Sequence, residues 1–311
     1  MHNCLVTVFC LAYNHEKYIR KTFEGFIKQN TTFRFKVLVH DDASTDSTPE
    51  IIREYIEKYP NIFEAIFQKE NKYQKGIDIE DEYILPMIKT KYVAVCECDD
   101  YWTDPSKLQL QVDYMESHPD CSMCVHNTEQ IFETGEPAGV FFNTSRKPKD
   151  YTMNDLILSE PSAYFHFSSL MWRHDLMKRK NDAFRMDGIG DYPQALYLAT
   201  KGYIHYIPRV MSRYRLNSIG SWSSMMQSDN KNKIRQHTNM MNGFKTIDLY
   251  TQHKYAPAIK KAIARESAKI MLLKDDYASL IKSPRCMVAF SKTMTHKAFR
   301  KVYMKYRAVR G

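Results

Sequence analysis

The 311-residue sequence contains no run of about 18 to 20 consecutive apolar residues, the length that a helix needs to cross a lipid bilayer. Its first residues, MHNCLVTVFCLAYN, lack the basic start of a secretory signal peptide and become polar too soon for one. We therefore expect a protein of the cytoplasm.

Cysteine is sparse and odd in number: seven residues are scattered through apolar segments. This argues against a closed disulfide framework and predicts that the cysteines are small buried hydrophobic residues. The spacing in CSMC, residues 121–124, would suit zinc, but the chain has no second such pair to complete four ligands. We expect a strand at that position, with packed cysteine side chains.

Two phosphate-binding motifs are also missing. The sequence has neither G-x-G-x-x-G nor G-x-x-x-x-G-K-[ST], which removes the two commonest ways for glycine-rich backbone to hold phosphates. A ligand that carries phosphate would need another kind of partner in this chain.

What the sequence does contain is an alternation of short apolar strands and amphipathic helices. With 43% hydrophobic residues, the chain can bury the core of one large domain or of two closely packed ones. The alternation predicts an α/β fold with a mostly parallel central sheet and helices on both faces. The first four expected strands are LVTVFCLA (5–12), FKVLVH (35–40), FEAIFQ (63–68) and YVAVCEC (92–98).

Helical periodicity and proline positions predict the intervening helices. Proline at the first position of a helix costs nothing, because its missing N–H would be unpaired there anyway. We therefore expect helices to begin at Pro49, capped by Thr48, and at Pro105, capped by Asp104. Between the first two strands, the periodicity places one apolar face on Tyr18, Ile19, Phe23, Phe26 and Ile27.

Acidic residues gather where two of the expected strands end. Asp41 and Asp42 follow the second strand, and Glu97, Asp99 and Asp100 follow the fourth. Open α/β sheets bind ligands at the carboxyl ends of their strands. Carboxylates repel phosphate, but they hold Mg²⁺ or Mn²⁺, which can also contact substrate phosphates. The pattern indicates a divalent metal and a phosphate-bearing substrate.

These segments resemble the family 2 glycosyltransferases with the GT-A (Rossmann-like) fold, and the resemblance covers roughly residues 4 to 225. Four motifs in consistent order are more specific than any one of them alone. They are AYN at 12–14, DDASTDST at 41–48, ECDDYWTDPSKLQLQVDYM at 97–115 and GIGDYPQALYLATKG at 188–202.

The resemblance implies a nucleotide-binding role for the first two motifs. Tyr13 matches the aromatic residue that lies against the nucleotide base, and Ala12 and Asn14 would flank it. Asp42 matches the residue that accepts a hydrogen bond from uracil. For Asp41, hydrogen bonding within the turn is the stronger expectation, as is common for short acidic side chains.

The other two motifs would carry the chemistry. Asp99 and Asp100 match the metal-binding carboxylates of the DXD region, and Glu97 stands at its first acid position, within reach of ribose or a metal-bound water. The family pattern has Asp where this chain has Glu97, which places that carboxylate one methylene farther forward. Asp191 matches the catalytic base, although it could instead cap the helix that begins at Pro193.

Two further features have less specific interpretations. Trp102 fits either a core position or a platform for a sugar. By resemblance, the segment from 203 to 223 closes over the donor phosphates, with Arg215 or Ser221 as candidate contacts.

Charge divides the chain unevenly. Residues from Lys254 onward hold 15 Lys and Arg against 3 acids, whereas the preceding residues hold 30 against 33.

We expect a glycosyltransferase domain at 1–225, with a nucleotide-sugar half (1–100) and an acceptor half (101–225), and a basic helical region at 226–311. Such a region could lie on an anionic membrane or be an ordinary solvated surface; nucleic acid is a less favoured partner. The apolar side of its last helix would be Phe299, Val302, Tyr303 and Tyr306.

Together these features predict an inverting, metal-dependent hexosyltransferase that uses a nucleotide-sugar, with UDP favoured, and a glycan or lipid-linked acceptor. Two alternatives stay open at this point. One is a non-catalytic scaffold of the same fold, bound to membrane or nucleic acid. The other is a metal-dependent nucleotidyltransferase, although the basic glycine-rich loop typical of that class is missing near the N-terminus.

Overall fold

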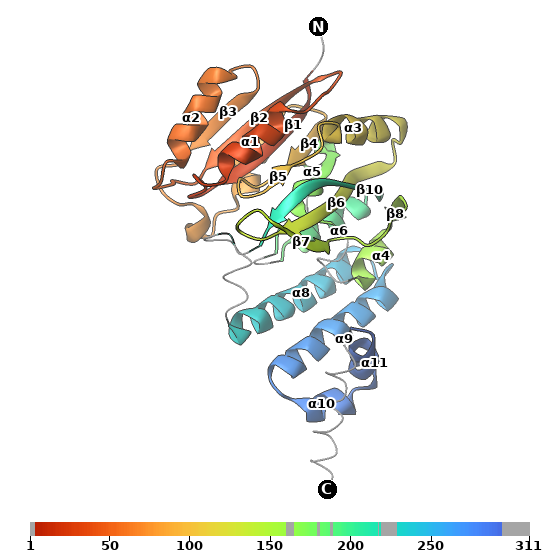
Figure 1. Ribbon diagram of the computed structural model, residues 1–311. Coiled ribbons are helices and arrows are strands. Elements are labelled where there is room, and N and C mark those ends of the chain that lie inside the picture. The colour runs from red at the N-terminus through yellow and green to blue at the C-terminus, as the bar shows by residue number, and fades with distance from the viewer. Residues whose placement is uncertain are drawn as a thin grey trace. The chain divides into compact units, whose positions relative to one another are not determined.

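The computed structural model describes residues 4–159, 165–178, 181–186, 189–216, 218 and 229–293. These residues form a ten-stranded mixed sheet in the order β3-β2-β1-β4-β9-β6-β10-β5, with β7 paired to β6 and β8 to β10 (Figure 1). The strands are β1 (Cys4–Ala12), β2 (Arg34–Asp41), β3 (Phe63–Phe67), β4 (Tyr92–Val95), β5 (Tyr101–Trp102), β6 (Cys121–Ile131), β7 (Pro137–Phe141), β8 (Lys149–Tyr151), β9 (Met171–Arg173) and β10 (Tyr203–Arg215).

Helices of very different length connect the strands and follow the last one. The α-helices are α1 (Ile19–Ile27), α2 (Thr48–Lys58), α3 (Lys107–Ser117), α4 (Met153–Leu158), α5 (His174–Met177), α6 (Asp191–Ala199), α8 (Asn230–Tyr250), α9 (Ala256–Leu273), α10 (Tyr277–Lys282) and α11 (Pro284–Thr293). Short 3₁₀ or π turns are η1 (Tyr73–Lys75), η2 (Glu80–Ile84), η3 (Leu85–Met87), η4 (Phe167–Ser169) and η5 (Asp182–Phe184). The predicted α/β class with C-terminal helices is confirmed.

The first half of the sheet is parallel. β3, β2, β1 and β4 pair in parallel, so the residues that follow β1, β2 and β4 lie at one edge. Two backbone hydrogen bonds tie these loops together: the Asp42 N–H donates to the Ala12 carbonyl at 2.9 Å, and the Cys98 N–H donates to the Leu11 carbonyl at 3.1 Å. The predicted acidic segments therefore meet at the carboxyl edge.

Both faces of the parallel strands are covered. On one face, side chains such as Val8 join a core with residues of α1, α2 and α3. Successive strand residues point to opposite faces, so Phe9 and His40 lie on the other side. There the Phe9 ring contacts Phe167 of η4 at 6.1 Å between centroids, and His40 contacts Tyr83 of η2 at 5.5 Å.

The apolar face predicted for the first helix is confirmed, since Tyr18, Ile19, Phe23 and Phe26 are buried and Ile27 is half-buried.

The predicted helix caps were wrong by one or two positions. The residue before α2 is Ser47, and the residue before α3 is Ser106. The oxygens expected to cap are used by the preceding loops: the Thr48 hydroxyl accepts the His15 N–H at 2.8 Å, and Asp104 Oδ1 accepts the Ser106 N–H at 2.9 Å.

Cysteine burial follows the expectation. Six of the seven cysteines are buried and Cys4 is half-buried. Cys121 and Cys124 lie on β6, the strand predicted for CSMC.

Lys107, at the start of α3, is a buried cation that the sequence did not reveal. Its side chain is fully buried, and Nζ lies 3.7 Å from the centroid of the Trp102 ring. Within the described residues Nζ has no hydrogen-bond partner. Burial lowers the pKa of Lys107 to about 7. Trp102 itself is a core residue, only 3% exposed, whose Nε1–H donates to the Ser168 carbonyl at 2.8 Å.

Gly25 of α1 lets the helix lie close to the backbone of β5. A Cβ at this position would lie 2.8 Å from the Trp102 carbonyl oxygen and 3.1 Å from its backbone nitrogen. Helix propensity alone predicts that Gly25→Ala stabilises the protein by about 1 kcal/mol. Because the obstacle is backbone, we expect instead a loss of about 1 to 3 kcal/mol in the free energy of unfolding, measured by urea denaturation. A gain in stability would show that this contact is not close.

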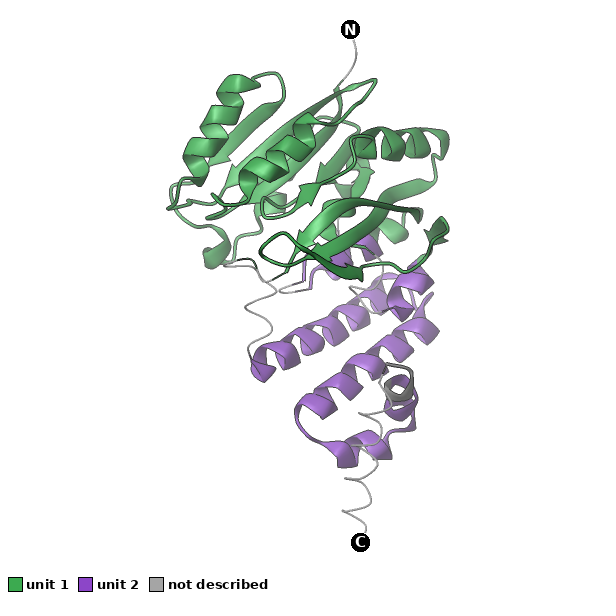
Figure 2. Ribbon diagram, viewed as in Figure 1, with its two compact units in different colours: residues 1–152, 162–180, 197–221 green, residues 153–161, 181–196, 222–311 purple. Residues whose placement is uncertain are grey.

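The chain divides into two compact units (Figure 2). The first comprises residues 1–152, 162–180 and 197–221, and the second comprises 153–161, 181–196 and 222–311. None of the helices in the described part of the chain is both long enough and apolar enough to span a membrane.

A buried ionic cluster holds the second unit together. Glu266 of α9 is fully buried and accepts hydrogen bonds from Arg265 Nε at 2.7 Å and His237 Nδ1 of α8 at 2.8 Å. Arg265 Nη1 also donates to the carbonyls of Ile157 and Leu158 in α4, at 3.3 and 3.1 Å. One carboxylate therefore connects α8 and α9, and its arginine partner reaches α4.

This cluster predicts a pH-dependent stability. Burial alone would raise the pKa of Glu266, but the hydrogen bond from His237 and the charges of Lys269 and Arg265 lower it from 4.5 to about 2. The resulting stabilisation, about 3 kcal/mol, is present above pH 4.5 and is lost as the pH falls towards 2. In urea unfolding, Glu266→Gln should be less stable than wild type at pH 7, and the difference should shrink on acidification. A difference independent of pH would contradict this assignment.

Candidate active site

The acidic turn after β4 brings three carboxylates together. Ligand oxygens of Glu97, Asp99 and Asp100 all lie within 4.8 Å of one another. Asp99 is 8% exposed and Asp100 is fully buried. The turn is held by its own backbone and by α1: the Asp100 N–H donates to the Glu97 carbonyl at 3.1 Å, and Thr22 Oγ1 of α1 donates to the Asp100 carbonyl at 2.5 Å.

This arrangement is electrostatically costly by itself. Burial, followed by the charges of Asp99 and Glu97, holds the pKa of Asp100 well above its ordinary value. Asp100 Oδ2 is buried and has no hydrogen-bond partner among the described residues, although His166 Nδ1 lies 3.5 Å away. A divalent cation would satisfy this oxygen and relieve the repulsion, and a set of carboxylate oxygens suits Mg²⁺ or Mn²⁺. The residues present therefore fit a metal site.

Arg215, at the end of β10, binds the acidic turn through both its backbone and its side chain. It is 5% exposed; its backbone N–H donates to Asp100 Oδ1 at 3.0 Å, and its Nε donates to the Asp99 carbonyl at 3.2 Å. Its Nη1 donates to the Glu133 carbonyl at 2.7 Å. These bonds make Arg215 an anchor of the acidic turn, and its contact with the donor phosphates stays a prediction. Ser221, the other candidate, lies outside the described residues.

The residues after β1 present one aromatic ring. Ala12 is buried, and Tyr13 is 37% exposed. Asn14 has a left-handed backbone (φ 57°) and links this loop to the next: its N–H donates to Ser44 Oγ at 2.9 Å, and its Oδ1 accepts the Thr45 N–H at 2.8 Å. The loop is thus fixed in a form that leaves the Tyr13 ring accessible.

The two acids after β2 have different partners. Asp41 Oδ2 accepts the Ser44 N–H at 3.3 Å, which agrees with the local role expected for it, and burial raises its pKa. Asp42 Oδ1 accepts the Lys72 N–H at 2.8 Å, and its Oδ2 accepts the Tyr73 N–H at 3.0 Å. Lys72 lies 30 residues and Tyr73 31 residues from Asp42 in a polar segment without a motif, so these contacts could not be predicted.

Asp191 is the first residue of α6 and falls in the second compact unit. Its Oδ1 accepts the Tyr192 N–H at 2.8 Å, as a residue at a helix N-terminus can. The following turn is firmly held, because the Tyr192 hydroxyl donates to the Leu156 carbonyl at 2.9 Å. Burial raises the pKa of Asp191, which favours a proton acceptor that works nearer neutral pH.

Residues 7–179, more than half of the chain, match the family model described as "Glycosyl transferase family 2". The chain is a family 2 glycosyltransferase.

The chain is also similar to known proteins over most of its length. An uncharacterized protein of Mycobacterium tuberculosis is 33% identical to this glycosyltransferase over 228 residues, covering 70% of the chain. The chain spans only 61% of that relative's length. The E. coli protein WfaP, named UDP-Glc:alpha-D-GlcNAc-diphosphoundecaprenol beta-1,3-glucosyltransferase, is 24% identical over 257 residues, covering 80% of this chain and 89% of its own.

Solved structures show the same GT-A-like fold. TarS from S. aureus, in complex with UDP, superposes with a TM-score of 0.60 at 17% identity, covering 94% of this chain and 76% of its own. The mannosyltransferase PcManGT from Pyrobaculum calidifontis, in complex with GDP-Man and Mn²⁺, gives a TM-score of 0.57 at 17% identity, covering 97% and 82%.

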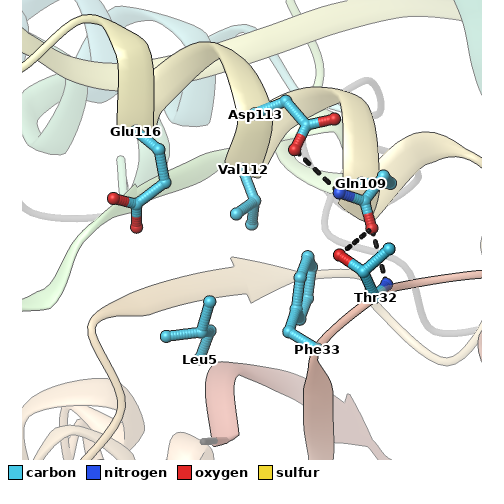
Figure 3. Close-up of a pocket in the computed structure, with 7 residues that line it drawn as sticks. All are labelled: Leu5, Thr32, Phe33, Gln109, Val112, Asp113 and Glu116. Atoms are coloured by element: carbon cyan, nitrogen blue, oxygen red, sulfur yellow. Dashed lines mark hydrogen bonds between the residues drawn. The ribbon is translucent and has the colours of Figure 1, made fainter. Parts of the chain in front are cut away.

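The glycosyltransferase also has a cavity at the opposite edge of the sheet, near the starts of β1 and β2 (Figure 3). Its volume is about 310 Å³. Several polar groups in its wall already have partners: Asp113 accepts from Gln109, Gln109 accepts from Thr32, and Glu116 is paired with Lys91. None of the sequence-predicted site residues lines it. The lining residues are Leu5, Thr32, Phe33, Gln109, Val112, Asp113 and Glu116.

Proposed function

We propose that this glycosyltransferase moves a hexose from a UDP-linked donor to a glycan or lipid-linked saccharide, with inversion at the anomeric carbon. The observation that carries the proposal is the compact group of Glu97, Asp99 and Asp100 at the carboxyl edge of the sheet, the edge at which the exposed Tyr13 follows β1. A non-catalytic scaffold would have no use for such a repulsive group.

The proposed roles follow from the chemistry of transfer. Asp99 and Asp100 would hold Mn²⁺ or Mg²⁺. The ion would stabilise the negative charge that develops on the departing diphosphate. Ala12, Tyr13 and Asn14 would form the wall against the nucleoside, and Glu97 would face the ribose. Asp191 would accept the proton of the attacking acceptor hydroxyl. One displacement from the face opposite the leaving group inverts the anomeric configuration.

We further propose that the basic C-terminal region contacts an anionic membrane, as would suit a lipid-linked acceptor. Support comes from the 15 basic and 3 acidic residues from Lys254 onward. The predicted apolar side of the last helix (Phe299, Val302, Tyr303, Tyr306) lies outside the described residues. Co-sedimentation with vesicles that contain phosphatidylglycerol should occur at low salt and weaken as salt screens the charges. Failure to sediment at low salt would refute this contact.

A donor screen tests the main proposal. The purified protein would be incubated with UDP-, GDP- and dTDP-sugars, with and without Mn²⁺, and released nucleoside diphosphate measured. We expect metal-dependent release from a UDP-sugar. Release of pyrophosphate from a nucleoside triphosphate and a sugar phosphate would indicate a nucleotidyltransferase instead. Binding of nucleotides without any turnover, across donors and simple acceptors, would favour a scaffold.

A further inference from the structure

One oxygen of the buried Asp100 carboxylate faces an imidazole that gives it no hydrogen bond. Oδ1 accepts the Arg215 N–H at 3.0 Å, whereas Oδ2 has no hydrogen-bond partner in the described part of the chain. Nδ1 of His166, the residue before η4, lies 3.5 Å from Oδ2. An ordinary N–H···O bond is about 2.7 to 3.2 Å long. The carboxylate is therefore fixed at one oxygen and unsatisfied at the other.

The bonds of His166 show which of its nitrogens carries the proton. The Ser168 N–H donates to His166 Nδ1 at 3.2 Å. A backbone N–H can only donate, so Nδ1 is an acceptor, and we assign the proton of the neutral ring to Nε2 from this bond. Two acceptor atoms, Nδ1 and Asp100 Oδ2, thus face each other without a proton between them.

The His166 ring is held in this orientation by packing and by hydroxyl groups. Its centroid lies 4.3 Å from that of Tyr214 in β10 and 4.9 Å from that of Phe142. Ser168 Oγ lies 2.9 Å from Nδ1 and donates to Ser212 Oγ of β10 at 3.0 Å, and both serines are fully buried. The ring cannot turn its Nε2–H towards Asp100 without breaking these contacts, and it lies where a water molecule would otherwise bind Oδ2.

We propose that His166 is a positioning residue that keeps Asp100 Oδ2 free of hydrogen bonds, so that this oxygen is ready for a divalent cation. The inference rests on the proposed metal-dependent function. An oxygen that is bound to a donor or to water must lose that bond before it can coordinate an ion, whereas Oδ2 loses nothing. The free energy that the unsatisfied oxygen costs the metal-free protein is recovered when the ion binds.

The test compares replacements of His166 that add a donor with replacements that do not. His166→Asn keeps an acceptor for the Ser168 N–H and adds an amide donor for Asp100 Oδ2. His166→Phe keeps a ring but adds no donor, and His166→Leu is a smaller side chain that also lacks one. Mn²⁺ binding to the purified full chain with UDP is measured by electron paramagnetic resonance of the free ion. Thermal unfolding without metal confirms that each variant is folded.

We expect His166→Asn to weaken Mn²⁺ binding by about 10- to 100-fold, the usual effect of changing a group that orients a metal ligand. At least one folded variant of the apolar pair should stay within about threefold of wild type, because neither offers Oδ2 a hydrogen bond. His174→Asn is the matched control. His174 is also buried, but it follows Arg173, which pairs with Tyr92 at the other end of β4. Its variant should stay within about twofold of wild type.

Three results would overturn the proposal, and they are distinguishable. If His166→Asn binds Mn²⁺ as tightly as wild type, His166 does not position the carboxylate. If the apolar variants lose as much affinity as His166→Asn, the imidazole nitrogen itself is needed and the absence of a donor is not the reason. If wild type with UDP binds no Mn²⁺, the proposed metal-dependent function fails, and the role of His166 fails with it.

Discussion

Replacement of Asp191 by asparagine is expected to lower the rate of sugar transfer by about 10²- to 10⁴-fold and to change nucleotide affinity by less than twofold. The rate loss is the usual contribution of a general base. Asparagine keeps an oxygen that can accept the Tyr192 N–H, so the start of α6 should be preserved. Single-turnover transfer kinetics and calorimetric titration of the nucleotide measure the two effects separately.

The raised pKa of Asp191 also predicts how the rate of sugar transfer falls at acidic pH. Burial raises the pKa of Asp191, and only its ionised form accepts a proton, so the rate should fall with decreasing pH at a higher pH than an ordinary aspartate would give. Normal transfer by Asp191→Asn would show that another group is the base. A loss of nucleotide binding equal to the loss of rate would show that Asp191 acts on folding or donor binding.

Replacement of Asp100 by asparagine is expected to lower the rate of transfer on the order of 10²- to 10³-fold, because the proposed metal would supply several kcal/mol of leaving-group stabilisation. Without metal, however, Asp100→Asn should be at least as stable as wild type. Asparagine keeps the oxygen that accepts the Arg215 N–H, and it removes a buried charge from beside Asp99 and Glu97. Differential scanning calorimetry without metal, with transfer assays at fixed Mn²⁺, checks both parts.

Asp113→Asn serves as the control, since it makes the same substitution at an exposed position of α3. A clear fall in the melting temperature of metal-free Asp100→Asn would mean that the carboxylate is satisfied by the fold itself. Unchanged transfer would mean that the acidic turn does not hold a catalytic metal.

Much of the fold and the acidic cluster could be predicted because both depend on local sequence pattern. The alternation of strands and helices fixes a parallel sheet, and parallel strands bring the residues after β1, β2 and β4 to one edge. The convergence of Glu97, Asp99 and Asp100 follows from their spacing in a single turn. Burial of CSMC in β6 likewise follows from a short strand pattern.

What could not be predicted depends on contacts between distant segments. Asp42 meets Lys72 and Tyr73 only because of how the loop after β3 folds back. Every residue except proline has a backbone N–H, so the sequence does not show which of these donors Asp42 will bind. Lys107 is the first residue of α3, a position at which lysine is ordinarily exposed, but tertiary packing buries its side chain against Trp102. The cap positions failed for a similar reason, since Thr48 bonds a residue of another loop rather than its own helix.

The most direct test of the account is a crystal soaked with Mn²⁺ and UDP, with anomalous scattering used to locate the metal. The account predicts one strong manganese peak bound by carboxylate oxygens of Asp99 and Asp100 and by the diphosphate of UDP. A diphosphate bound elsewhere, or these carboxylates turned away from any metal at saturating concentrations, would contradict it.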